Sequence, residues 1–147
     1  MNHDKMIFES YSPQQTEEIA YSIGKTLKPG EVICLSGELG AGKTAFTRGL
    51  VKAFDVKEPV TSPTFTIVNE YDGILPVYHF DVYRINDVEE MFEIGFEEYI
   101  YGNGISIIEW PEHIKEILPA SYINVTIRKN LDIGEQYRSI EVTKVGE

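Results

Sequence analysis

The sequence predicts an α/β fold, a mixed and mainly parallel sheet flanked by helices, in a single domain spanning residues 1–147. First, a buried strand at 32–36 leads through a glycine-rich loop into a helix. Second, two further apolar strands, at 75–85 and 105–110, are separated by a helical segment. Third, alternating strands at 122–129 and 137–143 form an antiparallel C-terminal pair.

The N-terminal elements are a strand and a capped helix. Residues 6–10, "MIFES", form a short first strand. Ser12 is an N-cap, Pro13 takes the first helical position and Gln15 completes a capping box. "KPGE" at 28–31 ends the helix. The apolar residues that share one face are Ile19, Ala20, Ile23 and Leu27.

The central elements alternate between strand and helix. The helix after the glycine loop runs from about Lys43 to Phe54, with Phe46 and Leu50 facing inward. Residues 59–73 are extended and end in a turn at Asp72-Gly73.

The next strand, 75–85, is buried up to Asp81. Residues 87–100 have helical spacing, and Gly95 breaks that helix in two. Pro111 stops the strand 105–110.

Composition limits the classes of function. With 24 acids against 13 bases the net charge is −11, so no global attraction to nucleic acid is expected. Anionic membranes should repel the chain, and no apolar run is long enough to span one. The one cysteine, Cys34, cannot form an internal disulfide and is expected in the core. A cytoplasmic location follows by default.

Residues 37–44 carry the clearest chemistry. Gly37, Gly42, Lys43 and Thr44 match G-x-x-x-x-G-K-[ST], the phosphate loop of P-loop NTPases. Glycines let backbone N–H groups form a nest for phosphate oxygens at a helix N-terminus. Lys43 can reach the β- and γ-phosphates, and the Thr44 hydroxyl can bind Mg²⁺. The nucleotide-binding residues predicted here are Gly37, Glu38, Leu39, Gly40, Ala41, Gly42, Lys43, Thr44 and Ala45, with the Glu38 side chain turned to solvent.

A second strand should supply an acid to the Mg²⁺ shell. Asp81 and Glu109 each end a buried strand, and the pattern alone does not choose between them. Either could instead be a capping or salt-bridged acid. The guanine motifs Asn-Lys-x-Asp and Asp-x-x-Gly are missing, which favours ATP. Small-molecule kinases with this loop generally need a substrate-binding insert and an arginine-bearing lid. The chain has only four arginines and little room for a lid, which disfavours a kinase.

Four segments together resemble a known family. "GELGAGKT", "SPTFTIVNEY", "YHFDVYRI" and "IIEWPE" occur in the order and approximate spacing of the bacterial TsaE (YjeE) family. The resemblance covers residues 12 to about 142. It implies an ATPase that binds ATP or ADP with Mg²⁺ and acts with TsaB and TsaD in forming threonylcarbamoyladenosine at position 37 of tRNAs. Direct contact with tRNA is doubtful because the net charge is −11.

The resemblance also implies residue roles. Lys43 and Thr44 take the phosphate and metal roles, Glu109 becomes the metal acid, and Asp81 positions water or supports the metal shell. Other implied residues are Ser62 and Thr64 in a switch segment, the functional aromatic Trp110, and Ser12 and Arg138 near the nucleotide.

Simpler interpretations stay open for several residues. Ser62-Pro63-Thr64 could form only a turn, and Trp110 could be a core anchor. His79 is favoured as a packed strand residue over a catalytic base. Arg84 either contacts phosphate or a partner, or pairs with a nearby acid.

The stretch 87–99 holds six acids and no bases. It is either a solvated helix face or a docking surface for basic TsaB or TsaD. No arginine is obviously placed as a transition-state finger, so we expect a Mg²⁺-dependent ATPase, weak alone and acting as a nucleotide-driven switch. The alternatives are a small-molecule kinase and a nucleotide sensor that does not hydrolyse ATP.

Overall fold

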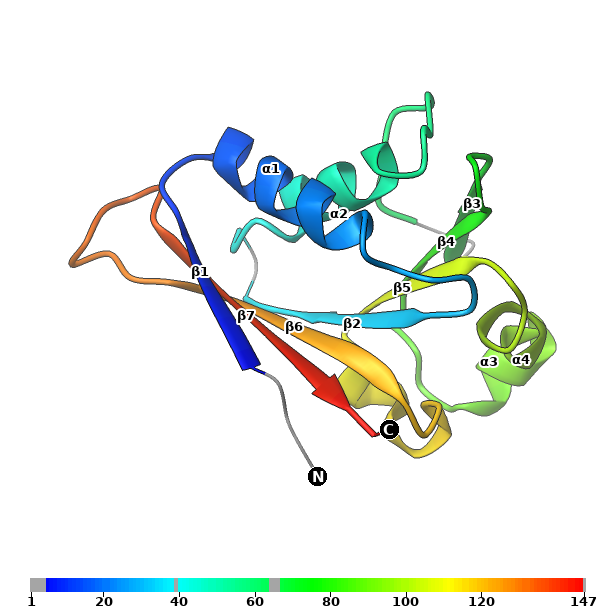
Figure 1. Cartoon of the computed structure of the whole chain (residues 1–147). Coiled ribbons are helices and arrows are strands. Elements are labelled where there is room, and N and C mark those ends of the chain that lie inside the picture. Colours follow the sequence, from blue (N-terminus) through cyan, green and yellow to red (C-terminus); the bar gives the residue numbers. More distant parts are fainter. Residues whose placement is uncertain (1–4, 39, 64–66, 147) are drawn as a thin grey trace.

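The computed structural model describes residues 5–38, 40–63 and 67–146, and these residues build one seven-stranded sheet. The strand order is β1-β7-β6-β2-β5-β4-β3, which Figure 1 shows from left to right. The strands are β1 (Lys5–Ser10), β2 (Val32–Ser36), β3 (Val68–Tyr71), β4 (Val77–Asp81), β5 (Ile105–Glu109), β6 (Tyr122–Lys129) and β7 (Arg138–Val145).

The centre of the sheet is parallel and its two sides are antiparallel. Strands β6, β2, β5 and β4 run parallel, whereas β7 pairs antiparallel with β6 and β1, and β3 pairs antiparallel with β4. The predicted fold class, including the antiparallel C-terminal pair, is confirmed. Because parallel strands end at the same edge, the residues that follow β2, β4 and β5 are gathered there.

Helices cover both faces of the sheet. The helices are α1 (Pro13–Gly24), α2 (Lys43–Lys52), α3 (Glu89–Glu93), α4 (Phe96–Ile100) and the 3₁₀ helix η1 (Pro111–Ile117). Helices α1 and α2 lie together over one face, and α3 and α4 lie over the other (Figure 1). The period of two along β2 divides its side chains between the faces: Ile33 and Leu35 pack under α1 and α2, whereas Val32 and Cys34 pack on the α3–α4 side.

The predicted helix starts and breaks are largely confirmed. The Ser12 side chain accepts a hydrogen bond from the Gln15 backbone N–H at 3.1 Å, as an N-cap does. The Gln15 side chain accepts from the Tyr11 N–H instead of the Ser12 N–H. Gly95 has φ 80° between α3 and α4, a conformation that favours glycine and separates the two helices.

Helix ends and one connection differ from the predictions. Helix α1 ends at Gly24 and not at "KPGE"; Leu27 lies in the turns that follow and still packs against the core. Helix α2 ends at Lys52, before Phe54. The 3₁₀ helix η1 was not predicted, because Pro111 marks the end of a strand equally well before a loop or before a helix. Across the described residues, no helix combines the length and hydrophobicity needed to cross a membrane.

Candidate functional site

The loop between β2 and α2 has the backbone that its glycines permit. Gly40 and Gly42 have φ of 76° and 106°, in the left-handed region that side chains disfavour. A Cβ on Gly37 would lie 2.9 Å from the Ile127 carbonyl oxygen of β6, so the loop passes close to the neighbouring strand. Glu38 is exposed, as expected, and Leu39 lies outside the described residues. The loop therefore follows a buried strand and opens a helix, with Ala41 and Ala45 buried beneath it.

Arg138 fastens this loop to β7. Its Nε donates to the Ala41 carbonyl at 2.8 Å and its Nη2 to the Gly40 carbonyl at 3.1 Å. Its Nη1 donates to the carbonyls of Glu135 and Tyr137. The family resemblance implied a position for Arg138 near the nucleotide. The structure places its guanidinium on the loop carbonyls, where it binds the outward-facing acceptors of the loop backbone.

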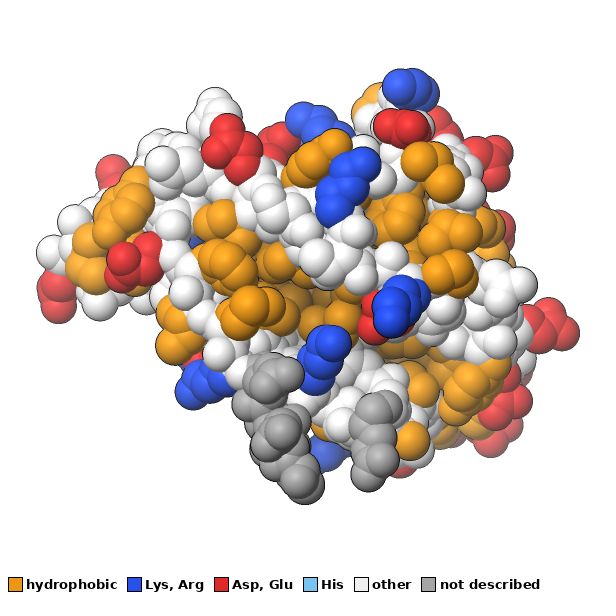
Figure 2. All heavy atoms as spheres, viewed as in Figure 1, with side chains coloured by type: hydrophobic (Ala, Val, Ile, Leu, Met, Phe, Trp, Pro, Cys, Tyr) orange, Lys and Arg blue, Asp and Glu red, His pale blue; other side chains and the backbone are white. Residues whose placement is uncertain are grey.

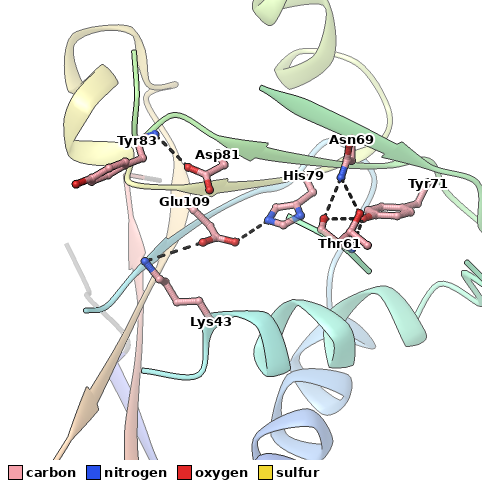
Figure 3. Close-up of polar contacts among 8 residues, drawn as sticks. All are labelled: Lys43, Thr61, Asn69, Tyr71, His79, Asp81, Tyr83 and Glu109. Carbon is pink, nitrogen blue, oxygen red and sulfur yellow. Dashed lines mark hydrogen bonds and ion pairs between the residues drawn. The ribbon is translucent and has the colours of Figure 1, made fainter. Parts of the chain in front are cut away.

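Lys43, the first residue of α2, converges with Glu109, the last residue of β5. The Lys43 Nζ lies 3.9 Å from Glu109 Oε1 and 4.0 Å from the centre of the Trp110 ring. The other carboxylate oxygen, Oε2, is 2.7 Å from His79 Nε2 (Figure 3). The side chains of Lys43 and Glu109 are each 9% exposed and that of His79 is 2% exposed. Charged groups held this far from water need partners, and here they partner one another.

Asp81 lies beside Glu109 at the same edge, because the two residues are register partners of β4 and β5. Its Oδ1 accepts a hydrogen bond from the Tyr83 backbone N–H at 3.1 Å (Figure 3). Thr44, in the first turn of α2, is exposed. The candidate acids Asp81 and Glu109 are thus neighbours, and Glu109 is the one that the sheet brings against Lys43.

These oxygen donors suit Mg²⁺, which prefers carboxylates, hydroxyls, water and phosphate oxygens. Within the ranges that the structure describes, no group of three or more His, Cys, Asp or Glu side chains could hold a metal by itself. Such a donor set fits a metal that arrives with phosphates and needs only one or two carboxylates from the protein.

An aromatic cluster that no sequence pattern predicted borders the site. Trp110 adopts φ 65°, so the chain turns sharply after β5 and the ring covers Lys43. The Tyr83 ring lies 4.8 Å from that of Trp110 and 5.8 Å from that of His113, between ring centres. Trp110 thus packs against the core of the α3–α4 side and also covers Lys43. His113 belongs to η1, and no spacing in the sequence places it near Tyr83.

The remaining predicted residues are less closely tied to the loop. Ser62 is exposed, and its neighbour Thr61 is held by hydrogen bonds with Tyr71 and Asn69 (Figure 3). Thr64 lies outside the described residues. Arg84 is exposed and forms no ion pair with any residue in the described ranges.

Ser12 reaches the same edge of the sheet through β1. Ser10 pairs in register with Arg138, so the start of α1 lies at the end of the sheet where Arg138 meets the loop. The Ser12 hydroxyl serves the α1 N-terminus, and no hydrogen bond among the described residues joins it to residues 37–44.

Cys34 takes no part in the chemistry of the candidate site. It is fully buried in the middle of β2. Burial, with a smaller effect from the Glu112 charge, raises the pKa of its thiol to about 12. Such a thiol stays protonated at neutral pH and is not a nucleophile. The prediction of a small core residue is confirmed.

The sheet order, the glycine loop after β2 and the lysine and hydroxyl that open α2 define a protein of the phosphate-loop class. The family model of the threonylcarbamoyl adenosine biosynthesis protein TsaE matches residues 10–139, so the chain belongs to the TsaE family.

Individual relatives agree with this family. The tRNA threonylcarbamoyladenosine biosynthesis protein TsaE of Bacillus subtilis is 41% identical over 140 residues, covering 95% of this chain and 85% of that protein. The protein of the same name from Treponema pallidum is 41% identical over 119 residues, covering 81% and 88%. The crystal structure of Bacillus subtilis YdiB matches with a TM-score of 0.80 and 35% identity, covering 99% of this chain and 89% of that one.

Proposed function

We propose that this protein binds ATP with Mg²⁺, hydrolyses it slowly, and serves tRNA threonylcarbamoyladenosine biosynthesis together with TsaB and TsaD in the cytoplasm. The observation that carries the proposal is the convergence of Lys43 and Glu109, 3.9 Å apart, where the glycine loop opens α2. A lysine for phosphate and an acid from a second strand are the two parts that a phosphate-loop hydrolase must bring together.

The loop and its lysine bind the nucleotide. In the proposed complex, backbone N–H groups of Gly42, Lys43 and Thr44 at the N-terminus of α2 would contact the phosphates, and Lys43 would neutralise charge on the β- and γ-phosphates. Arg138 keeps the loop carbonyls of Gly40 and Ala41 occupied, which helps the amides to face the other way. The Lys43 ammonium is held by Glu109 and Trp110, so nucleotide binding exchanges those partners for phosphate oxygens.

Hydrolysis adds water to the γ-phosphorus and breaks its bond to the bridging oxygen, which releases ADP and inorganic phosphate. Thr44 and Glu109 would hold Mg²⁺, which supplies charge neutralisation to the phosphates when bound. Asp81, next to Glu109 in the register of β4 and β5, is suited to accept a hydrogen bond from the attacking water. Among the described residues no arginine pairs with the Glu109 carboxylate, and the Arg138 guanidinium is taken up by the loop carbonyls, so turnover by the protein alone should be slow.

The exposed acids of α3 and α4 form the proposed docking surface for TsaD or TsaB. Asp87, Glu89, Glu93, Glu97 and Glu98 are exposed, whereas Met91, Phe96 and Ile100 are buried in the core. Figure 2 shows acidic side chains along the edge of the molecule where Figure 1 draws these helices. A basic partner surface would complement this charge.

Two substitutions and a matched control test the proposed activity. Thr44→Ala and Glu109→Ala should each lower ATP turnover to background and leave some ADP binding, because the loop amides and Lys43 are kept. Glu17→Ala, a glutamate of α1 outside the site, should turn over like the wild type. The assay measures ADP and free phosphate with TsaB and TsaD present.

Three results would overturn the proposal. If the wild type does not hydrolyse ATP in the presence of both partners, the protein is a nucleotide sensor and not a hydrolase. Phosphate that appears only on an added small-molecule acceptor would identify a kinase. If the affinity of this protein for TsaB or TsaD is the same at low and high salt, the acidic docking surface is ruled out, since screening weakens exposed charge pairs.

A further inference from the structure

A buried histidine controls one of the two oxygens of Glu109. His79 lies on β4, beside β5, and its Nε2 is 2.7 Å from Glu109 Oε2 (Figure 3). A carboxylate can only accept, so Nε2 carries the proton and donates it to the bond. The pair is sealed from water, with 2% of the His79 side chain and 9% of the Glu109 side chain exposed.

The two carboxylate oxygens of Glu109 face different partners. Oε2 accepts a hydrogen bond from His79, whereas the partner of Oε1 among the described residues is the Lys43 ammonium at 3.9 Å, which is beyond hydrogen-bond distance. The terminal torsion of a glutamate is broad, so an unrestrained carboxylate could rotate and present both oxygens to Lys43. The hydrogen bond to His79 fixes this torsion and leaves Oε1 facing the loop.

Packing alone does not account for a histidine at this place. The other ring nitrogen, Nδ1, is buried without a hydrogen-bond partner among the described residues. A buried polar atom without a partner is unfavourable, and an apolar side chain would fill a central strand at less cost. The benefit that offsets this cost is the bond to Glu109.

We propose that His79 is the positioning residue for Glu109: its Nε2–H aims the carboxylate at the metal-bound phosphates of the nucleotide. This inference rests on the proposed MgATP function, in which Glu109 acts on the metal. His79 itself touches neither nucleotide nor metal, and it acts only through the orientation of Glu109.

Three substitutions of His79 separate positioning from packing. His79→Gln keeps an N–H donor near the place of Nε2, His79→Asn keeps one near the place of Nδ1, and His79→Leu keeps bulk alone. Outer partners of metal-binding residues typically contribute about 10- to 100-fold to metal affinity or activity. We therefore expect His79→Leu and His79→Asn to lower kcat by about that factor, with KM for ATP rising only as far as the Mg²⁺-dependent affinity falls, and His79→Gln to recover much of the loss.

A binding measurement provides a readout without turnover. Calorimetry would compare ADP affinity in EDTA with ADP affinity in Mg²⁺. Leu and Asn at position 79 should reduce the gain in affinity that Mg²⁺ gives, and leave the affinity in EDTA at the wild-type value. Ser106→Ala is the matched control, because Ser106 is another buried polar residue of this sheet without a partner in the described structure, and it should behave as wild type.

The outcomes are distinct. Loss in the Leu and Asn variants with recovery in the Gln variant supports positioning. Equal behaviour of all three variants and Ser106→Ala overturns it, as does equal damage in Gln and Asn, which would indicate packing. If the Leu variant fails to fold, the Gln and Asn variants still decide the matter. If the wild type binds Mg·ADP but never hydrolyses ATP, the proposed hydrolase function is wrong. The positioning role of His79 can then still be tested by the affinity measurements.

Discussion

Glu17 and Glu109 each contact two basic side chains, and they differ in almost everything else. Glu17, on α1, lies 2.9 Å from Lys52 Nζ and 3.2 Å from Arg48 Nη1 on α2. Glu109, on β5, lies 2.7 Å from His79 and 3.9 Å from Lys43. Lys52 is 59% exposed at its side chain, whereas Lys43 is 9% exposed. At the surface cluster both contacts are within hydrogen-bond distance, whereas at the buried cluster only the contact with His79 is, and the charges there are desolvated.

This difference separates stability from function. Exposed ion pairs typically contribute about 0–1 kcal/mol, because water and salt screen them. The buried ion pair costs desolvation that a 3.9 Å contact recovers poorly. Its arrangement is explained better by a ligand that approaches Lys43 and Glu109 than by the stability of the fold. The largest effects on binding are therefore expected at the buried cluster.

Exchanging each lysine for methionine tests this contrast most strongly. Lys43→Met keeps the length of the side chain and removes the ammonium that we assign to phosphate. A charge-assisted hydrogen bond contributes about 1.5–3 kcal/mol, so ADP affinity should fall by about 10- to 150-fold. Lys52→Met at the surface cluster should leave the affinity unchanged. Calorimetry on both variants measures this, and equal affinities would remove the distinction between the clusters.

Trp110 offers a smaller effect at the buried cluster. It is the only tryptophan of the chain, and its ring lies 4.0 Å from the Lys43 ammonium. Nucleotide binding that draws Lys43 toward phosphate should change the tryptophan emission in a saturable way. A cation–π contact contributes about 0.5–2 kcal/mol, and binding gives it up, so Trp110→Leu should not weaken ADP binding through loss of this contact. An emission that ADP leaves unchanged would contradict the exchange of partners.

The surface cluster should show the smallest effect, and only in stability. Hydrogen bonding from Lys52, with a further contribution from Arg48, holds the pKa of Glu17 below its usual value against the opposing effect of partial burial. A lowered folded-state pKa stabilises the protein above the unfolded-state pKa, and this contribution is lost as the pH falls through the lowered value. Glu17→Gln should therefore lower the free energy of unfolding by less than about 1 kcal/mol at neutral pH and by nothing at strongly acidic pH.

Urea denaturation of wild type and Glu17→Gln at both pH values measures that difference. Salt should shrink it at neutral pH, because the side chains of Arg48 and Lys52 are 44% and 59% exposed. A loss of several kcal/mol would mean that the surface cluster is a structural anchor, and the comparison between the two glutamates would fail.

Much of the fold could be predicted because its signals are local. The Ser12 cap, the break at Gly95 and the alternating strands 122–129 and 137–143 depend on neighbours a few residues away. The phosphate loop is encoded in the same way, since Gly40 and Gly42 provide the backbone that it requires. The helix η1 could not be predicted, because Pro111 is compatible with several continuations of the chain.

The sequence by itself determined the glycine loop, the two candidate acids and the strands that end at them. Only the tertiary structure decided that Glu109 meets Lys43, that His79 holds the other oxygen of Glu109, and that Arg138 binds the loop carbonyls. These contacts join residues 30 to 98 positions apart, counting from His79 to Glu109 and from Gly40 to Arg138. They depend on β5 lying between β2 and β4, an order that long-range strand pairing fixes and that no local pattern encodes.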